Sequence, residues 1–262
     1  MTEVLIFFVI HWYGSLFFQT FFLHRYAAHQ QFTMSKTAEK VVYFLTWVFQ
    51  GSNYLSAHAY GLMHRLHHAY ADTEKDPHSP KFDKNIMAMM FRTGSLYSRI
   101  RTGEFKIEDK FKQAYYPHWK SFDNFASHWI TRLAWGTAYT LFYIHFVPAG
   151  MWYLYLLLPI HFMMAPVHGV VINWFAHKIG YVNFKVKDTS KNLMPWDLFM
   201  MGEGLHNNHH THGQSANFAQ KKYEFDPSYP IIRLLDWIGF IDLVDKKKGK
   251  RKFIEKAAPK AA

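Results

Sequence analysis

Residues 133–177 carry no formal charge, and these 45 consecutive positions limit the folds open to the chain. Pro148-Ala149-Gly150 interrupts the stretch near its middle. An α-helix rises about 1.5 Å per residue, so about 20 apolar residues cross the roughly 30 Å of hydrocarbon in a bilayer. The stretch therefore predicts a hairpin of two membrane-spanning helices, about 129–147 and 151–172, joined by a tight turn.

A second charge-free segment, residues 4–23, is 20 residues long and predicts a third span. It lacks the features of a cleaved signal peptide. Met1-Thr2-Glu3 is acidic rather than basic, and His24-Arg25-Tyr26 follows the apolar run where a small-residue cleavage site would stand. We expect the segment to remain in the mature protein.

Residues 41–63 are also uncharged, but five small or polar residues weaken the stretch as a spanning candidate: Gln50, Gly51, Ser52, Asn53 and Ser56. Histidine-rich motifs lie on both sides of it. These motifs can share one site only if an even number of membrane crossings separates them. We therefore expect 41–63 to be a buried or interfacial helix that returns to the side it left.

This arrangement places only residues 1–3 and the turn 147–151 on the far side of the membrane, and neither contains Lys or Arg. All 30 basic residues then lie on one face, which the positive-inside rule assigns to the cytoplasm. The net charge of +11 alone would also suit nucleic acid or an acidic ligand. The distribution of the charge favours contact with lipid headgroups, including contact by the basic tail at 245–262. We expect no nucleic-acid partner.

Near the C-terminus, the stretch Pro230–Val244 is rich in apolar residues but too short to span a bilayer. It predicts an amphipathic helix packed on the cytoplasmic part or lying at the membrane interface. The chain shows no internal repeat and no low-complexity linker, so one domain over 1–262 is expected.

Histidine is the most informative residue type here, because the chain has 18 His and no Cys. The lack of Cys excludes disulfides, thiolate-ligated haem and ordinary iron–sulfur clusters. Eight histidines fall in three short boxes: His24-Arg25-Tyr26-Ala27-Ala28-His29, His64-Arg65-Leu66-His67-His68 and His206-Asn207-Asn208-His209-His210.

The second and third boxes space their histidines i, i+3, i+4, which places the three imidazoles on one face of a helix. In the first box His24 and His29 are five residues apart, about 140° around a regular helix. That pair converges only if the helix ends or loosens near Ala27-Ala28.

Metal binding is the commonest way to satisfy so many buried imidazoles together, although a lone histidine is more often a hydrogen-bonded core residue. A catalytic zinc site has about three protein ligands, so eight or more imply two ions. Nitrogen-rich ligation with open positions suits non-haem iron and O2.

Taken together, HRYAAH, HRLHH followed by Asp76-Pro77-His78, and GEGLHNNHH at 202–210 resemble the membrane fatty acid desaturases of the stearoyl-CoA desaturase type. The resemblance covers about residues 20–244. It implies a ninth ligand in the element Asn173-Trp174-Phe175-Ala176-His177, with His177 as a metal ligand and Asn173 as a water-mediated one.

The resemblance further implies an all-α integral membrane protein with about three spans, interfacial helices and a cytoplasmic helical cap that holds two Fe ions. The implied reaction uses O2 to remove two hydrogens from a long-chain acyl substrate, with acyl-CoA as the expected carrier. No nucleotide, flavin or fused cytochrome motif is present, so a separate electron donor of ferredoxin or cytochrome b5 type is implied.

Asp76 and Glu203 lie beside the boxes, where carboxylates often orient metal-bound imidazoles, but solvated surface carboxylates would look the same in sequence.

Two departures from the animal enzymes bear on the acyl carrier. Leu62-Met63 precede HRLHH where those enzymes have Arg-Asp, and Trp174 replaces a serine. The alternatives are a hydroxylase on the same scaffold and a non-catalytic haem- or metal-binding membrane protein.

Overall fold

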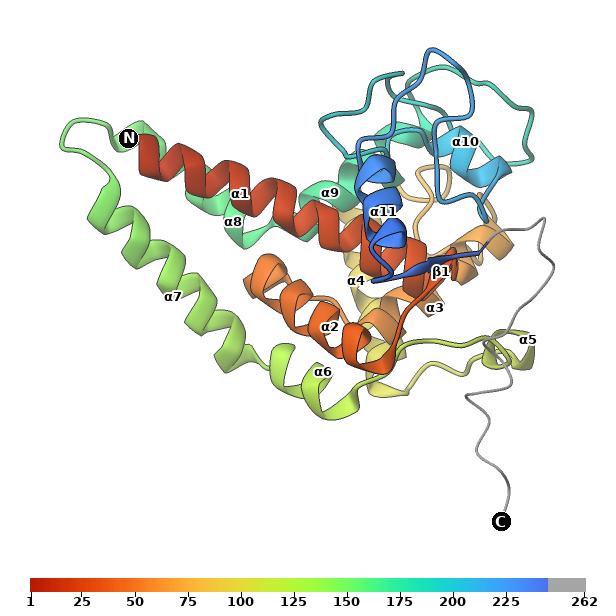
Figure 1. The fold of residues 1–262 in the computed structure, drawn as a ribbon, viewed down its shortest axis with the longest axis horizontal. Helices are drawn as coiled ribbons and strands as arrows, with labels where there is room; N and C mark the ends of the chain where they lie inside the picture. The colour runs from red at the N-terminus through yellow and green to blue at the C-terminus, as the bar shows by residue number, and fades with distance from the viewer. Residues whose placement is uncertain (245–262) are drawn as a thin grey trace.

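The computed structural model describes residues 1–244 and consists mainly of helices (Figure 1). The predicted all-α class is confirmed to that extent. The tail 245–262 lies outside the described residues, so its expected contact with lipid headgroups stays a prediction.

Helix α1 (Thr2–Phe18) continues without a break into a π-helical segment (Gln19–Ala28). Val4 and Leu16 are buried in the protein, whereas Leu5, Ile6 and Val9 are exposed. A helix that is apolar on both its packed and its exposed faces suits a membrane better than water.

The stretch 41–63, expected as one helix, is instead divided between α2 (Lys36–Gln50), a 3-10 turn (Gly51–Asn53) and α3 (Ala57–Tyr70). The break has a local cause. Gly51 adopts φ +51°, which ends α2, and the Ser56 side chain then accepts a hydrogen bond from the Ala59 amide to begin α3.

Helix α7 (Trp129–Phe146) follows the predicted bounds of the first arm of the hairpin. The second arm differs, because it consists of a 3-10 segment (Trp152–Leu157), α8 (Leu158–Phe162) and α9 (Met164–Asn173), bent by 71°. Pro166 explains the bend: it cannot donate a backbone hydrogen bond to the Phe162 carbonyl four residues earlier, and its ring would clash with that carbonyl.

Among residues 1–244, the helix Thr2–Ala28 is long and apolar enough to cross a membrane. The bent pair Trp152–Phe162 and Met164–His177 could form a second crossing if it acts as one broken span. The sequence predicts three spans, so this count is lower. The difference lies at α7, where Arg132 and several threonines reduce the apolar character.

The remaining elements lie between and after these helices along the chain. They are α4 (Ile86–Thr102), α5 (Asp109–Lys112), α6 (Lys120–Ala126), a 3-10 turn (Phe175–His177), α10 (His206–Thr211), α11 (Ser228–Trp237), β1 (Phe32–Thr33) and β2 (Asp242–Leu243). The amphipathic helix predicted for 230–244 is therefore shorter and ends at Trp237. Gly239, at φ +74°, turns the chain so that β2 pairs antiparallel with β1.

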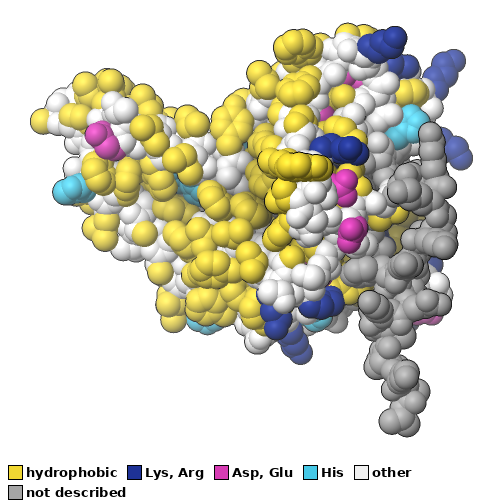
Figure 2. Space-filling model, viewed as in Figure 1, with side chains coloured by type: hydrophobic (Ala, Val, Ile, Leu, Met, Phe, Trp, Pro, Cys, Tyr) yellow, Lys and Arg dark blue, Asp and Glu magenta, His cyan; other side chains and the backbone are white. Residues whose placement is uncertain are grey.

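The two ends of the molecule differ in character. The N-terminal end of α1 packs through Val4 against Tyr143 and Leu154, on either side of the 147–151 turn, so these segments share one end (Figure 1). Helices α3 and α10 lie at the other end. Hydrophobic side chains dominate the first end on the face shown in Figure 2, and Lys and Arg side chains gather toward the second.

Candidate metal centre

The π-helical segment brings the two histidines of the first box together. The His29 amide donates to the His24 carbonyl at 3.1 Å, a bond that joins residues five apart. A helix with i→i+5 bonds is wider than an α-helix and stacks residue i+5 above residue i. The loosening on which convergence of this pair depends is therefore present, and it begins at Gln19.

All nine predicted histidines converge in two groups at the end of the molecule that contains α3 and α10. In each group the candidate ligand atoms lie within 4.8 Å of one another. The first group is His24, His29, His64, His68 and His209, and the second is His67, His177, His206 and His210. The histidines are buried or nearly so.

Each HxxHH box divides its histidines between the two groups. In α3, His64 and His68 belong to the first group and His67 to the second. In α10 the assignment is reversed, because His206 and His210 belong to the second group and His209 to the first. Residues i and i+4 point the same way on a helix and residue i+3 is turned aside, so each helix can contribute to both groups.

The Nε2 atoms point inward in both groups. In the first group, His64 Nε2 lies 2.9 Å from His29 Nε2 and His68 Nε2 lies 2.9 Å from His209 Nε2. In the second, His177 Nε2 lies 3.0 Å from His206 Nε2. Nitrogens bonded to one ion at about 2.1 Å and about 90° apart are separated by about 3.0 Å, so these spacings suit a shared ion.

Carboxylates contact the outer Nδ1 atoms of several of these rings. Asp76 accepts from His67 at 2.8 Å, Asp188 accepts from His210 at 3.0 Å, and Glu203 lies 2.6 Å from His24 Nδ1. Asp72 is 3.7 Å from His177 Nδ1. Asp76 and Glu203 thus contact histidines of the boxes, and their orienting role stays a prediction.

The pair His67 and His210 tests whether a cation fits the second group. Burial alone would raise the pKa of Asp76 and of Asp188, but their histidine partners hold both pKa values below the ordinary range. Both carboxylates are therefore ionised and can only accept, so each ring carries its proton on Nδ1. Two Nε2 lone pairs then face each other over 3.2 Å, which is favourable only with a cation between them.

Burial favours the neutral form of five of these imidazoles. Desolvation lowers the pKa of His64, His68, His206 and His209 well below the ordinary value, and neighbouring imidazoles lower it further. Desolvation also lowers the pKa of His210 to about 4. Neutral imidazole is the form that binds metal, so at neutral pH these rings are ready to act as ligands.

Buried charged residues surround the Glu203 carboxylate that lies beside His24. Arg25 is fully buried, and its guanidinium contacts Asp226 at 2.7 Å and Glu203 at 3.4 Å. Thr20 hydrogen-bonds the same Glu203 carboxylate. The network fixes the Glu203 oxygen that faces His24 Nδ1, and that contact in turn fixes the orientation of the ring.

Asn173, predicted as a water-mediated ligand, is the last residue of α9, and its half-buried side chain makes no hydrogen bond within residues 1–244. Its predicted role therefore stays a prediction. Sequence reasoning missed Asp72 and Asp188. Both lie in polar loops whose sequences resemble solvent-exposed segments. Each is far in sequence from the histidine that it contacts, so no short motif connects the two residues.

Apart from His177, the histidines outside the boxes are not brought to this centre, with the exception of His78, whose ring packs 4.4 Å from that of His67. His161 and His168 need polar partners if they lie within a span. His161 has His11 at 2.5 Å and Tyr143 at 2.9 Å, and His168 lies 3.4 Å from Gln19.

The fold and the two histidine groups define a helical protein with a candidate metal centre built from histidine. A family model described as fatty acid desaturase matches residues 3–219, most of the chain. The chain belongs to the fatty acid desaturase family, and it is therefore an oxidoreductase of lipid metabolism from a membrane-associated family.

Relatives with assigned names agree with this membership. The chain is 29% identical to the Delta-9 desaturase-like 5 protein of Arabidopsis thaliana, over 84% of this chain and 69% of that protein. It is 30% identical to the Delta-9 acyl-lipid desaturase 2 of Arabidopsis thaliana, over 82% and 66%. It is 28% identical to an acyl-CoA C20 Delta5-desaturase of Anemone leveillei, over 86% and 68%. The chain thus spans about two thirds of the length of these relatives.

Proposed function

We propose that this chain is an O2-dependent desaturase that introduces a double bond into a long-chain acyl group at a pair of iron ions held by the nine histidines. The observation that carries the proposal is the division of the boxes into two groups with inward Nε2 atoms and outward Nδ1 contacts. Nitrogen ligands with open positions suit iron that reacts with O2.

When bound, the two irons supply the oxidising power that removes hydrogen from an unactivated methylene, which no side chain can do. The protein binds and orients. Asp76 and Asp188 keep His67 and His210 in the tautomer with a free Nε2 lone pair, and Glu203 orients His24. Burial of both groups keeps bulk water from the reacting region.

The acyl carrier that we propose is CoA. Exposed basic residues such as Arg99, Arg101 and Lys112 lie within 81–120 on the polar end and could pair with its phosphates. The relatives include proteins named for acyl-CoA and proteins named for acyl-lipid substrates, so a lipid-linked acyl group is the alternative to be tested.

The electrons are proposed to come from a separate ferredoxin or cytochrome b5 type protein that docks on the polar end of the molecule. In this proposal the polar end and the C-terminus face the cytoplasm, and the N-terminus faces the opposite side. The basic surface there complements an acidic donor protein, and such charge pairing mainly raises the rate of association.

The test is expression in a host that lacks its own desaturase, followed by mass spectrometry of the fatty acids. We expect products two mass units lighter than the saturated precursor, and supply of acyl-CoA or acyl-lipid to membranes identifies the carrier. A gain of sixteen mass units would instead identify a hydroxylase.

Variants His67→Ala and His209→Ala remove one predicted ligand from each group and should abolish product formation, while both proteins still insert into membranes. His128→Ala is the matched control, because His128 is exposed and distant from the centre, and it should retain activity. Turnover that persists in either ligand variant would contradict the proposal.

A further inference from the structure

Two surface segments beside α10 carry a group of lysines outside the metal centre (Figure 1). They are residues 183–189 and 220–223. The Tyr223 hydroxyl donates to the Asn183 side chain at 2.9 Å. The Lys221 ammonium lies 4.5 Å from the centre of the Phe184 ring, so the two segments are side by side. We call their lysines the lysine patch: Lys185, Lys187, Lys221 and Lys222.

The positive charge of the lysine patch is not compensated at the surface. Three of its lysines are exposed and Lys221 is half-buried, and none forms an ion pair with a carboxylate among residues 1–244. The one carboxylate within the two segments, Asp188, accepts from His210. Glu224 follows the second segment, but it is buried and accepts hydrogen bonds from two asparagines. The patch therefore favours a partner with an acidic surface.

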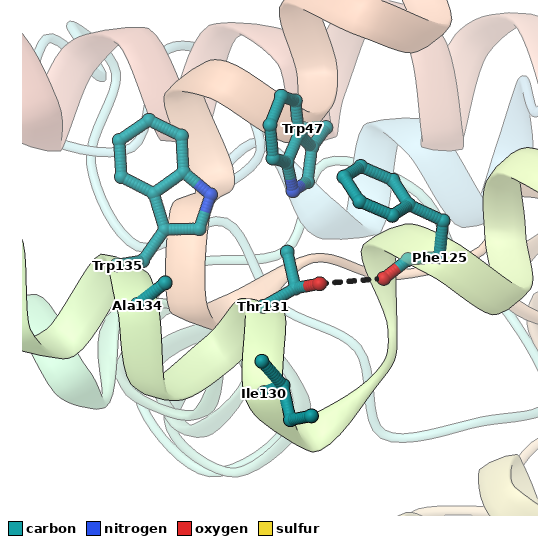
Figure 3. A pocket seen from close by; sticks show the side chains of 6 residues that line it. All are labelled: Trp47, Phe125, Ile130, Thr131, Ala134 and Trp135. Carbon is teal, nitrogen blue, oxygen red and sulfur yellow. Dashed lines mark hydrogen bonds between the residues drawn. The ribbon is translucent and has the colours of Figure 1, made fainter.

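Two other surfaces are less suited to an acidic partner. In and beside α5, Lys110 pairs with Glu108 at 3.2 Å and Lys112 pairs with Asp109 at 2.7 Å, so these lysines are partly neutralised. The groove between α2, α6 and α7 has a lining without any charged residue (Figure 3). An acidic protein gains less from either surface than from the lysine patch.

The first segment also contacts two predicted ligands of the second histidine group. Asp188 accepts from His210 Nδ1 at 3.0 Å, and the hydroxyl of the exposed Thr189 lies 3.3 Å from His177 Nδ1. In both rings the contact is made by the nitrogen opposite the inward Nε2 atom. One side-chain contact therefore separates this surface segment from each of the two rings.

The same segment is fixed to α10 at its other end. The Phe184 amide donates to the Asn207 side-chain oxygen at 2.9 Å, and the Asn207 side-chain nitrogen donates to the Phe184 carbonyl at 2.9 Å. Asn207 directly follows His206, another member of the second group. Electron transfer slows steeply with distance, so a protein that delivers electrons gains by docking where short bonded routes lead from the surface to the ligands.

We propose that the lysine patch is the docking surface for an acidic electron-carrier protein, whose electrons enter the metal centre through the second histidine group. Such docking presupposes the proposed function, which requires an external donor. In each transfer one electron leaves the reduced carrier, which is oxidised, and reduces one ferric ion of the second group to the ferrous state. No covalent bond forms or breaks.

The test measures binding of two acidic one-electron carriers, the haem domain of cytochrome b5 and a plant-type ferredoxin, to the full chain in detergent. Lys185→Glu combined with Lys222→Glu reverses two charges of the lysine patch. We expect the dissociation constant of the carrier that binds to rise at least about tenfold at low salt. The difference should shrink when the salt concentration is raised to about 0.5 M, because screening weakens contacts between exposed charges.

Lys40→Glu combined with Lys120→Glu is the matched control. Both lysines are exposed, and they lie in α2 and α6, on the side of the molecule away from α10 (Figure 1). The same change of net charge should alter the dissociation constant by less than about twofold there, because distant charges are screened. This comparison needs no substrate and no turnover, so it decides whether or not the chain forms a desaturated product.

The entry point is tested with the same carriers in reduced form, mixed with iron-loaded chain under argon. The variant with His206→Ala and His210→Ala lacks two members of the second group and should no longer oxidise the carrier. The matched variant of the first group, with His64→Ala and His68→Ala, should still oxidise it.

Equally tight binding of a carrier to the lysine-patch variant and to the unmodified chain would overturn the docking surface. Absence of salt-sensitive binding of both carriers to the unmodified chain would overturn it as well. Oxidation that survives in the second-group variant, or that is lost in the first-group variant, would overturn the entry point.

Discussion

In some imidazoles at the centre, the contact made by one ring nitrogen leaves the other nitrogen as the ligand atom. His67 and His210 show this most clearly, because their Nδ1 protons are committed to Asp76 and Asp188. The sequence could indicate Asp76, which lies eight residues after its box. It could not indicate Asp188, since 22 residues separate this carboxylate from His210 and only the folded loop brings them together.

Asp188→Asn tests whether the contact of one carboxylate with His210 Nδ1 orients that ring for metal binding. The amide oxygen can still accept from His210 Nδ1, but the negative charge that strengthens this bond is lost. We expect metal affinity, measured by competition with a chelating dye, to fall about 10- to 100-fold. Asp109→Asn is the control, because its side chain is 92% exposed and remote from the centre. Equal affinities of the Asp188 variant and the unmodified chain would contradict the orienting role.

At the scale of the element, helix spacing predicts that the histidines of one box share a helix face. It predicts neither how they divide between the two groups nor how the chain reaches them. The HxxHH pattern is sufficient to place histidines of one helix near each other. The π-helical turns before Ala28 depend on tertiary packing, whereas the break at Gly51 and the bend before Pro166 have local causes in the sequence. A run of apolar residues predicts single helices over 41–63 and 151–172, because a glycine or a proline within such a run does not always interrupt a helix.

The turn before α10 offers a test at this scale. Gly202 adopts φ +94°, and an added Cβ would overlap the Asp226 carboxylate. Gly202→Ala should therefore cost more than about 2 kcal/mol of stability and displace Glu203 from His24. The measurement is the melting temperature in detergent, together with metal content.

Gly94→Ala is the matched control for this change. Gly94 lies in α4 with open space around its Cα, so alanine should raise stability by about 0.5–1 kcal/mol. A melting temperature of the Gly202 variant at or above that of the unmodified chain would show that the turn is not constrained as described.

At the scale of the whole molecule, the fold gathers nine buried or nearly buried imidazoles at the end opposite the N-terminus. The order and spacing of the boxes predict this convergence, because histidines from distant segments must lie together if they bind metal at one centre. The number of crossings could not be predicted as well, since helix α7 is mostly apolar but also carries Arg132, one histidine and three threonines.

Burial of neutral imidazoles makes the metal-free protein sensitive to acid. The folded His210 has its pKa lowered to about 4 from the ordinary 6.5, so between these values the unfolded chain binds more protons than the folded chain. Stability must then decrease as pH falls through this window. Chelator-treated protein should melt at a lower temperature at pH 5 than at pH 7, and His210→Asn should reduce the difference. A melting temperature independent of pH would contradict the neutral, buried state of these rings.

The most direct test of the two-ion centre is the number of transition-metal ions bound per chain, measured by mass spectrometry of protein purified from its iron-supplemented native host. The account predicts two, predominantly iron, falling to about one when both His206 and His210 are replaced by Ala. A count of zero or one in the unmodified chain, or a count of two that is unaffected by those replacements, would contradict it.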